Sequence, residues 1–415
     1  MKKKLLILSF IFCTLPVLLY CQNNPEAEAE KLKIKLLKVG GTEKARTLLS
    51  LSYIYNTLST DSAFHYAQMA LKFAKILKND TLIGRSLLYI GQAHLLSGND
   101  SLCISAFSES AEIFKKNNDS LNLANVLTAI GQYYYYKAEY DNSYRAYNKA
   151  LVIYSKLNDP KSYDNVILVL NGISFIYFER KDYKNTLFYM HRALKIADAL
   201  NDNGYTVATL YSSMGSVYYD WKQYDKALEY YRKAFEINKS NGNSSLLGYS
   251  LNEVGKTYLI MGHSDTAYYY FSEAAIIFSE VKDDLGISVS DQYMGDIYQE
   301  KQKFEIALRY YKTALSICEK KDEQARMSSI LFEIGKTYYK MKLMDRALEN
   351  SNRSLNIALK VGFTDYIYKD YELLSDIYTA MDSCGNAFFF YKKFITKRDS
   401  IFNKDIHQQI SDIQG

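Results

Sequence analysis

A pattern of small, aliphatic and aromatic residues returns about every 40 residues along most of the chain, and it restricts the folds that are possible. In residues 210–238 the pattern indicates two helices joined by a tight corner, with Gly215 in the first helix and Ala227, Tyr231 and Ala234 about a turn apart in the second. The small residues lie where two helix axes come close. A pair of helices cannot bury its apolar side alone, so the recurrence predicts a stack of helical hairpins.

The recurrence holds several residue classes at once through nine successive segments. The small position of the first helix is Ser52, Gly91, Gly131, Ser174, Gly215, Gly255, Gly295, Gly335 and Ser375. Three residues later come Tyr55, His94, Tyr134, Tyr177, Tyr218, Tyr258, Tyr298, Tyr338 and Tyr378, which we expect in the core. The small position of the second helix is Ala63, Cys103, Ser143, Thr186, Ala227, Ala267, Ala307, Ala347 and Ala387. A chance period would not keep all these classes in register.

The spacing resembles the tetratricopeptide repeat (TPR) signature W-x2-L-G-x2-Y…A-x3-F, with Tyr211 at the Trp, Met214 at the Leu and Tyr231 at the Phe. The resemblance implies an all-α fold, a right-handed TPR-type α-solenoid of nine helix-turn-helix repeats. The period departs from the usual family length of about 34 residues. The additional residues add about one turn to the helices, and the closing proline of the family is present only at Pro160.

We divide the chain into four segments: a secretory signal at 1–21, an N-terminal capping helix at 22–41, the solenoid at 42–397 and a C-terminal helix extension at 398–415. The first segment has a basic start at Lys2–Lys4 and an apolar run too short to span a bilayer comfortably. We therefore expect an exported protein, periplasmic or envelope-associated, with no membrane span in the mature chain. A lipid anchor at Cys21 is disfavoured because Tyr20 stands where lipoproteins have a small residue.

The last predicted helix continues past its repeat with a stripe of apolar residues. The stripe consists of Ile395, Phe402, Ile406, Ile410 and Ile413. Two interpretations stay open: a terminal helix that folds back as a cap, or the start of a two-chain coiled coil that forms a homodimer.

The sequence offers little for catalysis or for nucleic acid. The formal net charge is +5, and removal of Lys2–Lys4 leaves 5 − 3 = +2, too small for an electrostatic nucleic-acid binder. HExxH, GxSxG and P-loop patterns are missing, and the histidines fall in separate repeats, with His94 expected as a packed structural residue. Cys103, Cys318 and Cys384 lie too many repeats apart for a disulfide. We predict no catalytic residues, no metal and no cofactor.

The resemblance implies that the first helices line an inner groove. Counting from Gly215, the groove positions are six and three residues before it and one, four and five after it. We predict binding by aromatic and amide side chains, which suit a peptide backbone. The candidate groove residues are Tyr135, Tyr136, Asn171, Phe178, Tyr219, Tyr249, Asn252, Lys256, Gln292, Lys336 and Tyr339. The Lys/Asn/Arg set of chaperone-binding TPR domains is missing from these positions, so that function does not carry over.

Two functions fit these observations. The first is a non-catalytic module that binds a protein or peptide segment. An exported array that continues as residues 391–402 resembles the extracytoplasmic input region of TPR-containing bacterial sensor kinases and regulators, and this resemblance implies a sensory role within the first hypothesis. The second is a structural scaffold of an envelope assembly, acting through convex or terminal surfaces and dimerisation.

Overall fold

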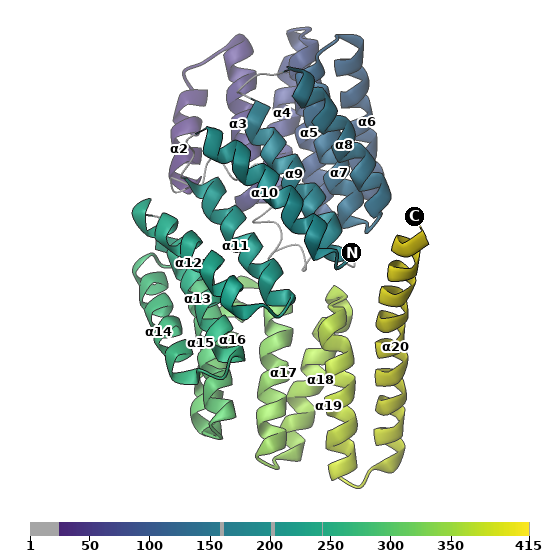
Figure 1. Cartoon of the computed structure of the whole chain (residues 1–415). Helices are drawn as coiled ribbons and strands as arrows, with labels where there is room; N and C mark the ends of the chain where they lie inside the picture. Colours follow the sequence, from purple (N-terminus) through teal and green to yellow (C-terminus); the bar gives the residue numbers. More distant parts are fainter. Residues whose placement is uncertain (1–24, 158–161, 201–203, 243, 415) are drawn as a thin grey trace. The chain divides into compact units, whose positions relative to one another are not determined.

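The computed structural model describes residues 25–157, 162–200, 204–242 and 244–414, with side chains as far as residue 399. The predicted signal segment 1–21 lies outside these residues. Every regular element in the described part of the chain is a helix, which confirms the all-α prediction. The helices α3 to α20 form the nine expected hairpins (Figure 1). The chain divides into two compact units, an N-terminal unit that ends at Leu210 and a C-terminal unit that begins at Tyr211.

The N-terminal unit contains a single helix followed by four hairpins. They are α2 (Pro25–Leu36), α3 (Gly41–Leu58) with α4 (Thr60–Ile76), α5 (Asp80–Ser97) with α6 (Asp100–Lys116), α7 (Ser120–Tyr136) with α8 (Tyr140–Leu157), and α9 (Tyr163–Glu179) with α10 (Tyr183–Ala199). The next helix, α11 (Tyr205–Asp220), crosses the boundary between the units.

The C-terminal unit contains the rest of α11 and the following helices. They are α12 (Tyr224–Ser240), α13 (Ser244–Ile260) with α14 (Ser264–Glu280), α15 (Asp284–Glu300) with α16 (Phe304–Lys321), α17 (Gln324–Lys340) with α18 (Met344–Val361), and α19 (Thr364–Ala380) with α20 (Cys384–Gln414).

Packing within each unit is between neighbours. The two helices of a hairpin pack on each other, and the second helix packs on the first helix of the next hairpin, as α14 does on α15. The first helices of successive hairpins also touch, as α5 does with α7 and α13 with α15. This arrangement brings the first helices side by side, which is what a binding surface made of first helices needs.

The small position of the first helix makes room for an aromatic ring of the second. A Cβ added at Gly215 would lie 2.6 Å from two ring atoms of Tyr231, a distance that real Cβ atoms do not reach. The same relation holds for four more pairs: Gly91 with Phe107, Gly131 with Tyr147, Gly255 with Phe271 and Gly295 with Tyr311. The close approach predicted at Gly215 is therefore between a helix and a side chain, and the ring keeps the two axes apart. In two serine repeats the link is polar: Ser52 Oγ donates to Ala63 O at 2.8 Å, and Ser375 Oγ donates to Ala387 O at 3.0 Å.

The aromatic positions three residues after the small position, such as Tyr218, are less buried than we expected for core residues. Of the eight tyrosines at these positions only Tyr338 is buried, and the others are partly exposed. In five repeats the ring lies flat on a ring of the second helix. The pairs are Tyr177–Tyr189, Tyr218–Tyr230, Tyr258–Tyr270, Tyr298–Tyr310 and Tyr378–Phe390, with interplanar angles from 6° to 13°. A stacked pair at the hairpin surface buries one face of each ring and leaves the other in water.

The sequence predicts a left-handed residue followed by a cap at four junctions between hairpins: Asn79–Asp80, Asn118–Asp119, Asn158–Asp159 and Asn201–Asp202. Asn118 has a φ of 54° and Asp119 accepts a hydrogen bond from Asn122 N at 3.1 Å. At Asn79–Asp80 the motif is shifted by one residue, because Lys78 takes the left-handed conformation and Asn79 is the cap. The junctions at Asn158 and Asn201 fall outside the described residues.

The two ends of the array differ. In the N-terminal unit α2 packs on α3 through Ala29, which is 1% exposed and contacts Leu51 and Ile54. In the C-terminal unit α20 runs as one helix to Gln414, and the side chains of its predicted stripe beyond Ile395 lie outside the description. Among the described helices, none combines the length and the apolarity that crossing a bilayer requires.

The cysteines and His94, which replaces tyrosine in its repeat, show no sign of a chemical role in the described residues. Cys103 and Cys318 are free and buried, and Cys384 is free and exposed at the start of α20. The ring of His94 lies 4.8 Å from the ring of Phe64, and burial lowers its pKa, which fits a packed residue.

Candidate functional site

The inner surface of the N-terminal unit is hollowed into a cavity of about 580 Å³. Almost all of its wall comes from first helices, together with α2, and one residue comes from a second helix. The lining residues are Glu28 and Leu32 of α2; Ser50, Tyr53 and Ile54 of α3; Arg85, Leu88, Tyr89 and Gln92 of α5; Leu121, Asn122, Asn125, Thr128, Ala129 and Gln132 of α7; Tyr154 of α8; and Asn165 and Leu168 of α9. The volume falls within the range of about 300–1,000 Å³ that is usual for small-ligand sites.

The rows that line the cavity follow from helical spacing. Residues six and three before the small position, and one after it, are separated by three and four residues and share one side of a helix. In α5 these are Arg85, Leu88 and Gln92, and in α7 they are Asn125, Thr128 and Gln132. The whole row lines the cavity in α5 and α7, whereas α3 and α9 contribute one residue of the row each, Tyr53 and Leu168.

Several polar groups of the wall are held in place by hydrogen bonds. The hydroxyl of Tyr154 donates to Asn125 Oδ1 at 2.6 Å, which fixes the amide and leaves its Nδ2 free to turn toward a ligand. Thr128 Oγ1 donates to Ala124 O at 2.9 Å. Tyr53 and Tyr89 meet edge to face, with ring centroids 6.2 Å apart. Ordered amide and aromatic side chains of this kind lose little freedom when a ligand binds.

Gln92 has an unused hydrogen-bond acceptor. Its side chain is 7% exposed, and Oε1 is buried with no hydrogen-bond partner among the described residues. A buried carbonyl oxygen without a donor costs about 1–3 kcal/mol, so groups of this kind are usually satisfied. Because Gln92 lines the cavity, a ligand can supply the missing donor.

Two ionisable side chains in the cavity wall lack an ionic partner. Arg85 is partly buried, and within the described residues its guanidinium makes no ion pair, hydrogen bond or ring contact. Glu28 is partly buried and has no cationic group within ion-pair distance in that part of the chain. Burial raises the pKa of Glu28, and Lys31 on the same helix offsets part of that rise.

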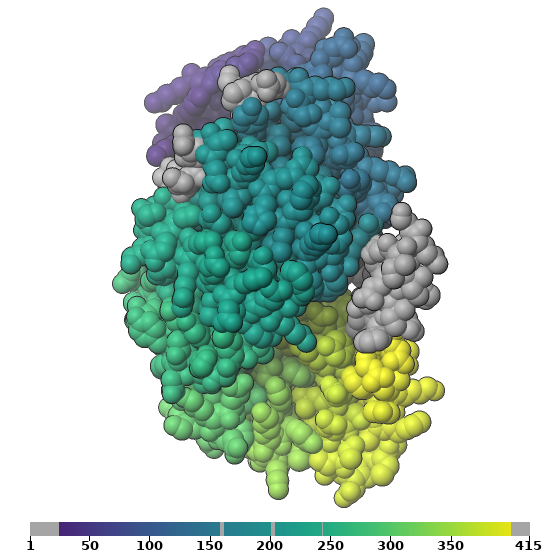
Figure 2. Space-filling model, viewed as in Figure 1, coloured from purple at the N-terminus to yellow at the C-terminus, as the bar shows by residue number. Residues whose placement is uncertain are grey.

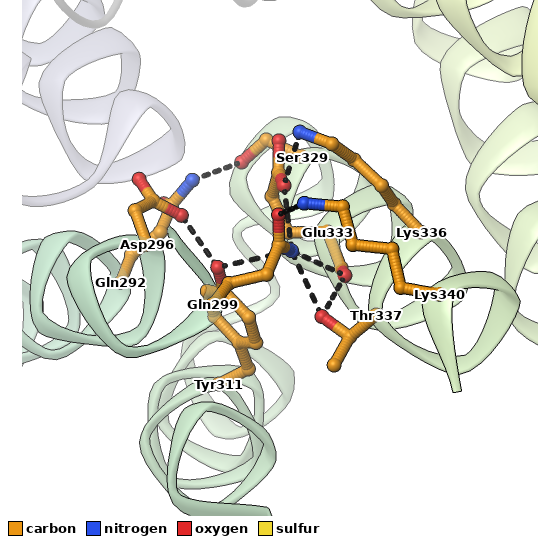
Figure 3. A network of polar contacts seen from close by, with 9 residues as sticks. All are labelled: Gln292, Asp296, Gln299, Tyr311, Ser329, Glu333, Lys336, Thr337 and Lys340. Carbon is orange, nitrogen blue, oxygen red and sulfur yellow. Dashed lines mark hydrogen bonds and ion pairs between the residues drawn. The ribbon is translucent and has the colours of Figure 1, made fainter. Parts of the chain in front are cut away.

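In the C-terminal unit, a group of polar side chains on α15, α16 and α17 forms a connected hydrogen-bond network (Figure 3). Gln299 of α15 is 4% exposed, and its Nε2 donates to Thr337 Oγ1 at 2.8 Å and to Glu333 Oε2 at 3.2 Å. Its Oε1 accepts from Lys340 Nζ at 3.0 Å. Glu333 also pairs with Lys336 at 3.2 Å. The network joins α15 to α17 and is a structural cross-link.

Asp296 is the most perturbed carboxyl of this network. Burial, followed by the negative charge of Glu333, raises its pKa to about 7, and a hydrogen bond from Tyr311 at 2.6 Å opposes the rise. On the neighbouring helix, Lys256 pairs with Glu253 at 3.0 Å and lies 4.4 Å from the ring centre of Tyr219. Burial favours the neutral form of Lys256, but Glu253 and nearby tyrosines raise its pKa overall.

The eleven residues predicted from the sequence lie outside the lining of the cavity. Tyr135, Tyr136 and Phe178, at the last two predicted positions, approach the hairpin corners: the Tyr135 hydroxyl donates to Glu179 at 3.1 Å, and its ring contacts Tyr140. Asn171 and Asn252 are buried, at 3% and 2% exposure. Their use in binding stays a prediction.

The other predicted residues belong to the C-terminal unit and take part in its internal packing. The Tyr249 ring packs on Phe278 with centroids 4.8 Å apart. Gln292 donates to Ser329 at 3.5 Å. Tyr339 packs against the core around Leu331. Tyr219, Lys256 and Lys336 make the pairs described above.

Three cavity residues that matter most, Glu28, Arg85 and Gln92, were not among the predicted site residues. The counting rule reaches Arg85 and Gln92 when it is applied to the second repeat, since they lie six before and one after Gly91. Glu28 carries no such signal, because α2 stands before the first repeat. In the described residues, we find no group of three or more His, Cys, Asp or Glu side chains that could hold a metal ion.

Comparison with known proteins identifies the repeats. Family models described as tetratricopeptide repeat match residues 165–240 and 294–321. A TPR repeat-containing protein of Methanocaldococcus jannaschii is 24% identical over 278 residues, which cover 61% of this chain and 42% of that protein. The chain thus spans less than half the length of this curated relative.

Two solved structures share the fold. The apo form of RapI superposes with a TM-score of 0.62 at 16% identity and covers 87% of this chain and 99% of its own. The Rap conjugation gene regulator of the plasmid pLS20, in complex with the Phr* peptide, gives a TM-score of 0.50 at 16% identity and covers 85% of this chain and 96% of its own. At these identities the likeness concerns the fold alone.

Proposed function

We propose that this array of tetratricopeptide repeats is a non-catalytic binding module and that the cavity of its N-terminal unit holds a peptide segment. The observation that carries the proposal is the buried, unpartnered Oε1 of Gln92 in the wall of a cavity of about 580 Å³. A peptide backbone N–H is the donor that this oxygen lacks.

The remaining wall suits the same ligand. The amides of Asn122, Asn125 and Asn165 can donate to and accept from a peptide backbone, and Tyr53 and Tyr89 offer rigid aromatic area for its side chains. The structural relative from pLS20 was solved with the Phr* peptide, which supports a peptide as the ligand class.

A binding experiment tests the proposal. Wild-type protein is incubated with a fluorescent random hexapeptide library, and the retained peptides are measured by fluorescence anisotropy. Gln92→Met keeps the size of the side chain and removes the acceptor, so we expect affinity to fall about tenfold, the value of one buried hydrogen bond. Gln68→Met, an exposed position on α4, is the matched control and should bind as wild type does. The proposal is wrong if no peptide is retained, or if Gln92→Met binds as tightly as the control.

The place of action is a separate proposal that rests on the sequence of residues 1–21. We propose export to the cell envelope, with cleavage after Cys21, and use of the module as sensory input there. Cell fractionation, with mass spectrometry of the purified chain, tests this. A chain that keeps residues 1–21 in the cytoplasmic fraction would contradict export.

A scaffold role is the second candidate, and the outer side of the last hairpin favours it. Phe388, Phe389 and Tyr391 of α20 are 68%, 51% and 52% exposed. This hairpin is the yellow end of the surface in Figure 2. Ultracentrifugation of wild type beside Phe388→Ser with Phe389→Ser tests self-association. Equal sedimentation as a monomer would count against dimerisation through this surface.

A further inference from the structure

We infer that the ligand of the N-terminal cavity carries two opposite charges, a carboxylate that binds Arg85 and a cationic group that binds Glu28. The inference rests on the proposed function and specifies the peptide that this site selects. It follows from two side chains that line one cavity, are partly buried and form no ion pair within hydrogen-bond distance in the described residues.

Arg85 is placed to receive an anion. It stands on α5 in the same row as Leu88 and Gln92, and its guanidinium has five N–H donors that no group in the described part of the chain uses. A guanidinium matches a carboxylate with two parallel hydrogen bonds, which a lysine cannot reproduce.

Glu28 is placed to receive a cation. It comes from α2, the helix before the first repeat, so it reaches the cavity from a different element than Arg85 does. Burial disfavours its charged form, and the charge that offsets this comes from Lys31 on its own helix. A cationic ligand group would restore the interactions that the carboxylate lost with water.

The arrangement of these two groups argues for a ligand that satisfies both. Each side chain is partly buried in the cavity wall and open to a ligand charge, whereas elsewhere in the unit charged side chains form pairs such as Arg180 with Asp141 at 2.6 Å. A neutral peptide leaves both groups unsatisfied. A peptide with two like charges satisfies one and is repelled by the other, so the cavity discriminates by repulsion as well as attraction.

The charges of the ligand can come from side chains or from free termini. Peptides with blocked termini, Lys near one end, Glu near the other and two to five uncharged residues between them test the side-chain source. The same peptides with Gln at both places are the neutral probes. Unblocked neutral peptides test the termini. Affinities are measured by fluorescence anisotropy on the full chain.

We expect at least one charged or unblocked set to bind about tenfold or more tightly than the blocked neutral set, and Arg85→Gln or Glu28→Gln to remove that difference. Arg85→Glu should prefer a blocked peptide with two Lys over the Lys–Glu peptide, a reversal that a merely weakened site would not show. Arg145→Gln and Glu112→Gln, at exposed positions on second helices, are charge-matched controls and should bind as wild type does. Melting without peptide should be unchanged or raised in Arg85→Gln and Glu28→Gln.

Two results would contradict the inference, and only the second would also contradict the proposed function. If blocked neutral peptides bind wild type as tightly as all charged and unblocked ones, and Gln92→Met weakens them, the charge selection is wrong while peptide binding stands. If none of the peptides binds, the proposed function fails as well.

Discussion

At the scale of single residues, five of the hairpins depend on a glycine in the first helix that leaves space for an aromatic ring of the second helix. A glycine in the first helix and an aromatic ring sixteen residues later occur jointly at Gly91, Gly131, Gly215, Gly255 and Gly295. Where the small residue is Ser174 the partner position holds Met190, a flexible side chain that is fully buried. In these five repeats the period in the sequence records a packing relation between two positions, whereas Gly335 is followed by Ser351 and Ser375 by Tyr391.

Replacing Gly215 with Ala should destabilise the protein. The added Cβ would lie 2.6 Å from the Tyr231 ring, which is 1% exposed and has no room to move. Overpacking of this kind costs about 1–3 kcal/mol, and Gly215→Leu should cost more. Urea unfolding measures the loss.

The matched control is Gly385→Ala in the first turn of α20, where an added Cβ meets nothing within 4 Å. It should leave stability unchanged or raise it by up to about 1 kcal/mol, because alanine favours a helix over glycine. Equal effects at the two positions would show that the ring of Tyr231 yields freely.

Asp370 should make stability depend on pH. The side chain is fully buried on α19, Ser354 Oγ donates to its Oδ2 at 2.8 Å, and burial raises its pKa to about 8 from an ordinary value of 3.8. Between these values the folded chain holds a proton that the unfolded chain releases, so this residue makes stability fall as pH rises from about 4 to 8. The free energy of unfolding in urea at pH 5, 6.5 and 8 should fall less steeply in Asp370→Asn than in wild type. Identical slopes would contradict the raised pKa.

At the scale of elements, the sequence predicts the hairpins well because both of their requirements are local. Helical spacing defines the packed side of each helix, and corner residues such as Asn118 and Asp119 end one helix and begin the next. The location of the cavity was harder to predict. It depends on how α2 and four first helices lie side by side, and no single repeat contains that information. In α5 and α7 the first three counted positions line the cavity, whereas the last two approach the corner, where Tyr135 packs on Tyr140.

The same position in different hairpins should respond differently to truncation. Tyr311 of α16 and Tyr391 of α20 both lie sixteen residues after the small position, but Tyr311 is fully buried beneath α17 while Tyr391 is 52% exposed. Tyr311→Ala should cost about 3 kcal/mol or more, through the cavity and the lost hydrogen bond to Asp296. Tyr391→Ala should cost less than about 1 kcal/mol. Thermal and urea unfolding of the two variants give the comparison, and a large cost at Tyr391 would mean that its exposed ring is covered in solution.

At the scale of the whole molecule, stability is a sum of local terms. In each unit helices contact their sequence neighbours or the next first helix, so a change in one hairpin is felt by the hairpins beside it. A single cooperative transition is then not required, and a repeat can open while distant repeats keep their hydrogen bonds. A ligand in the N-terminal cavity, which contacts α2, α3, α5, α7 and α9 together, would couple helices that otherwise open separately.

Gly91→Ala tests this locality in the intact chain. The added Cβ would lie 2.5 Å from Phe107, which destabilises the hairpin of α5 and α6. We expect faster amide exchange, measured by mass spectrometry, in α3 to α8 and unchanged exchange in α15 to α20, because three hairpins separate the two groups along the array and coupling passes between neighbouring hairpins. Gly98→Ala is unsuitable as a control because its φ of 74° strains any side chain, so Gln68→Met serves instead and should change neither region. Faster exchange throughout the chain would show that the nine hairpins unfold as one unit, and the account of stability by neighbouring pairs would then be wrong.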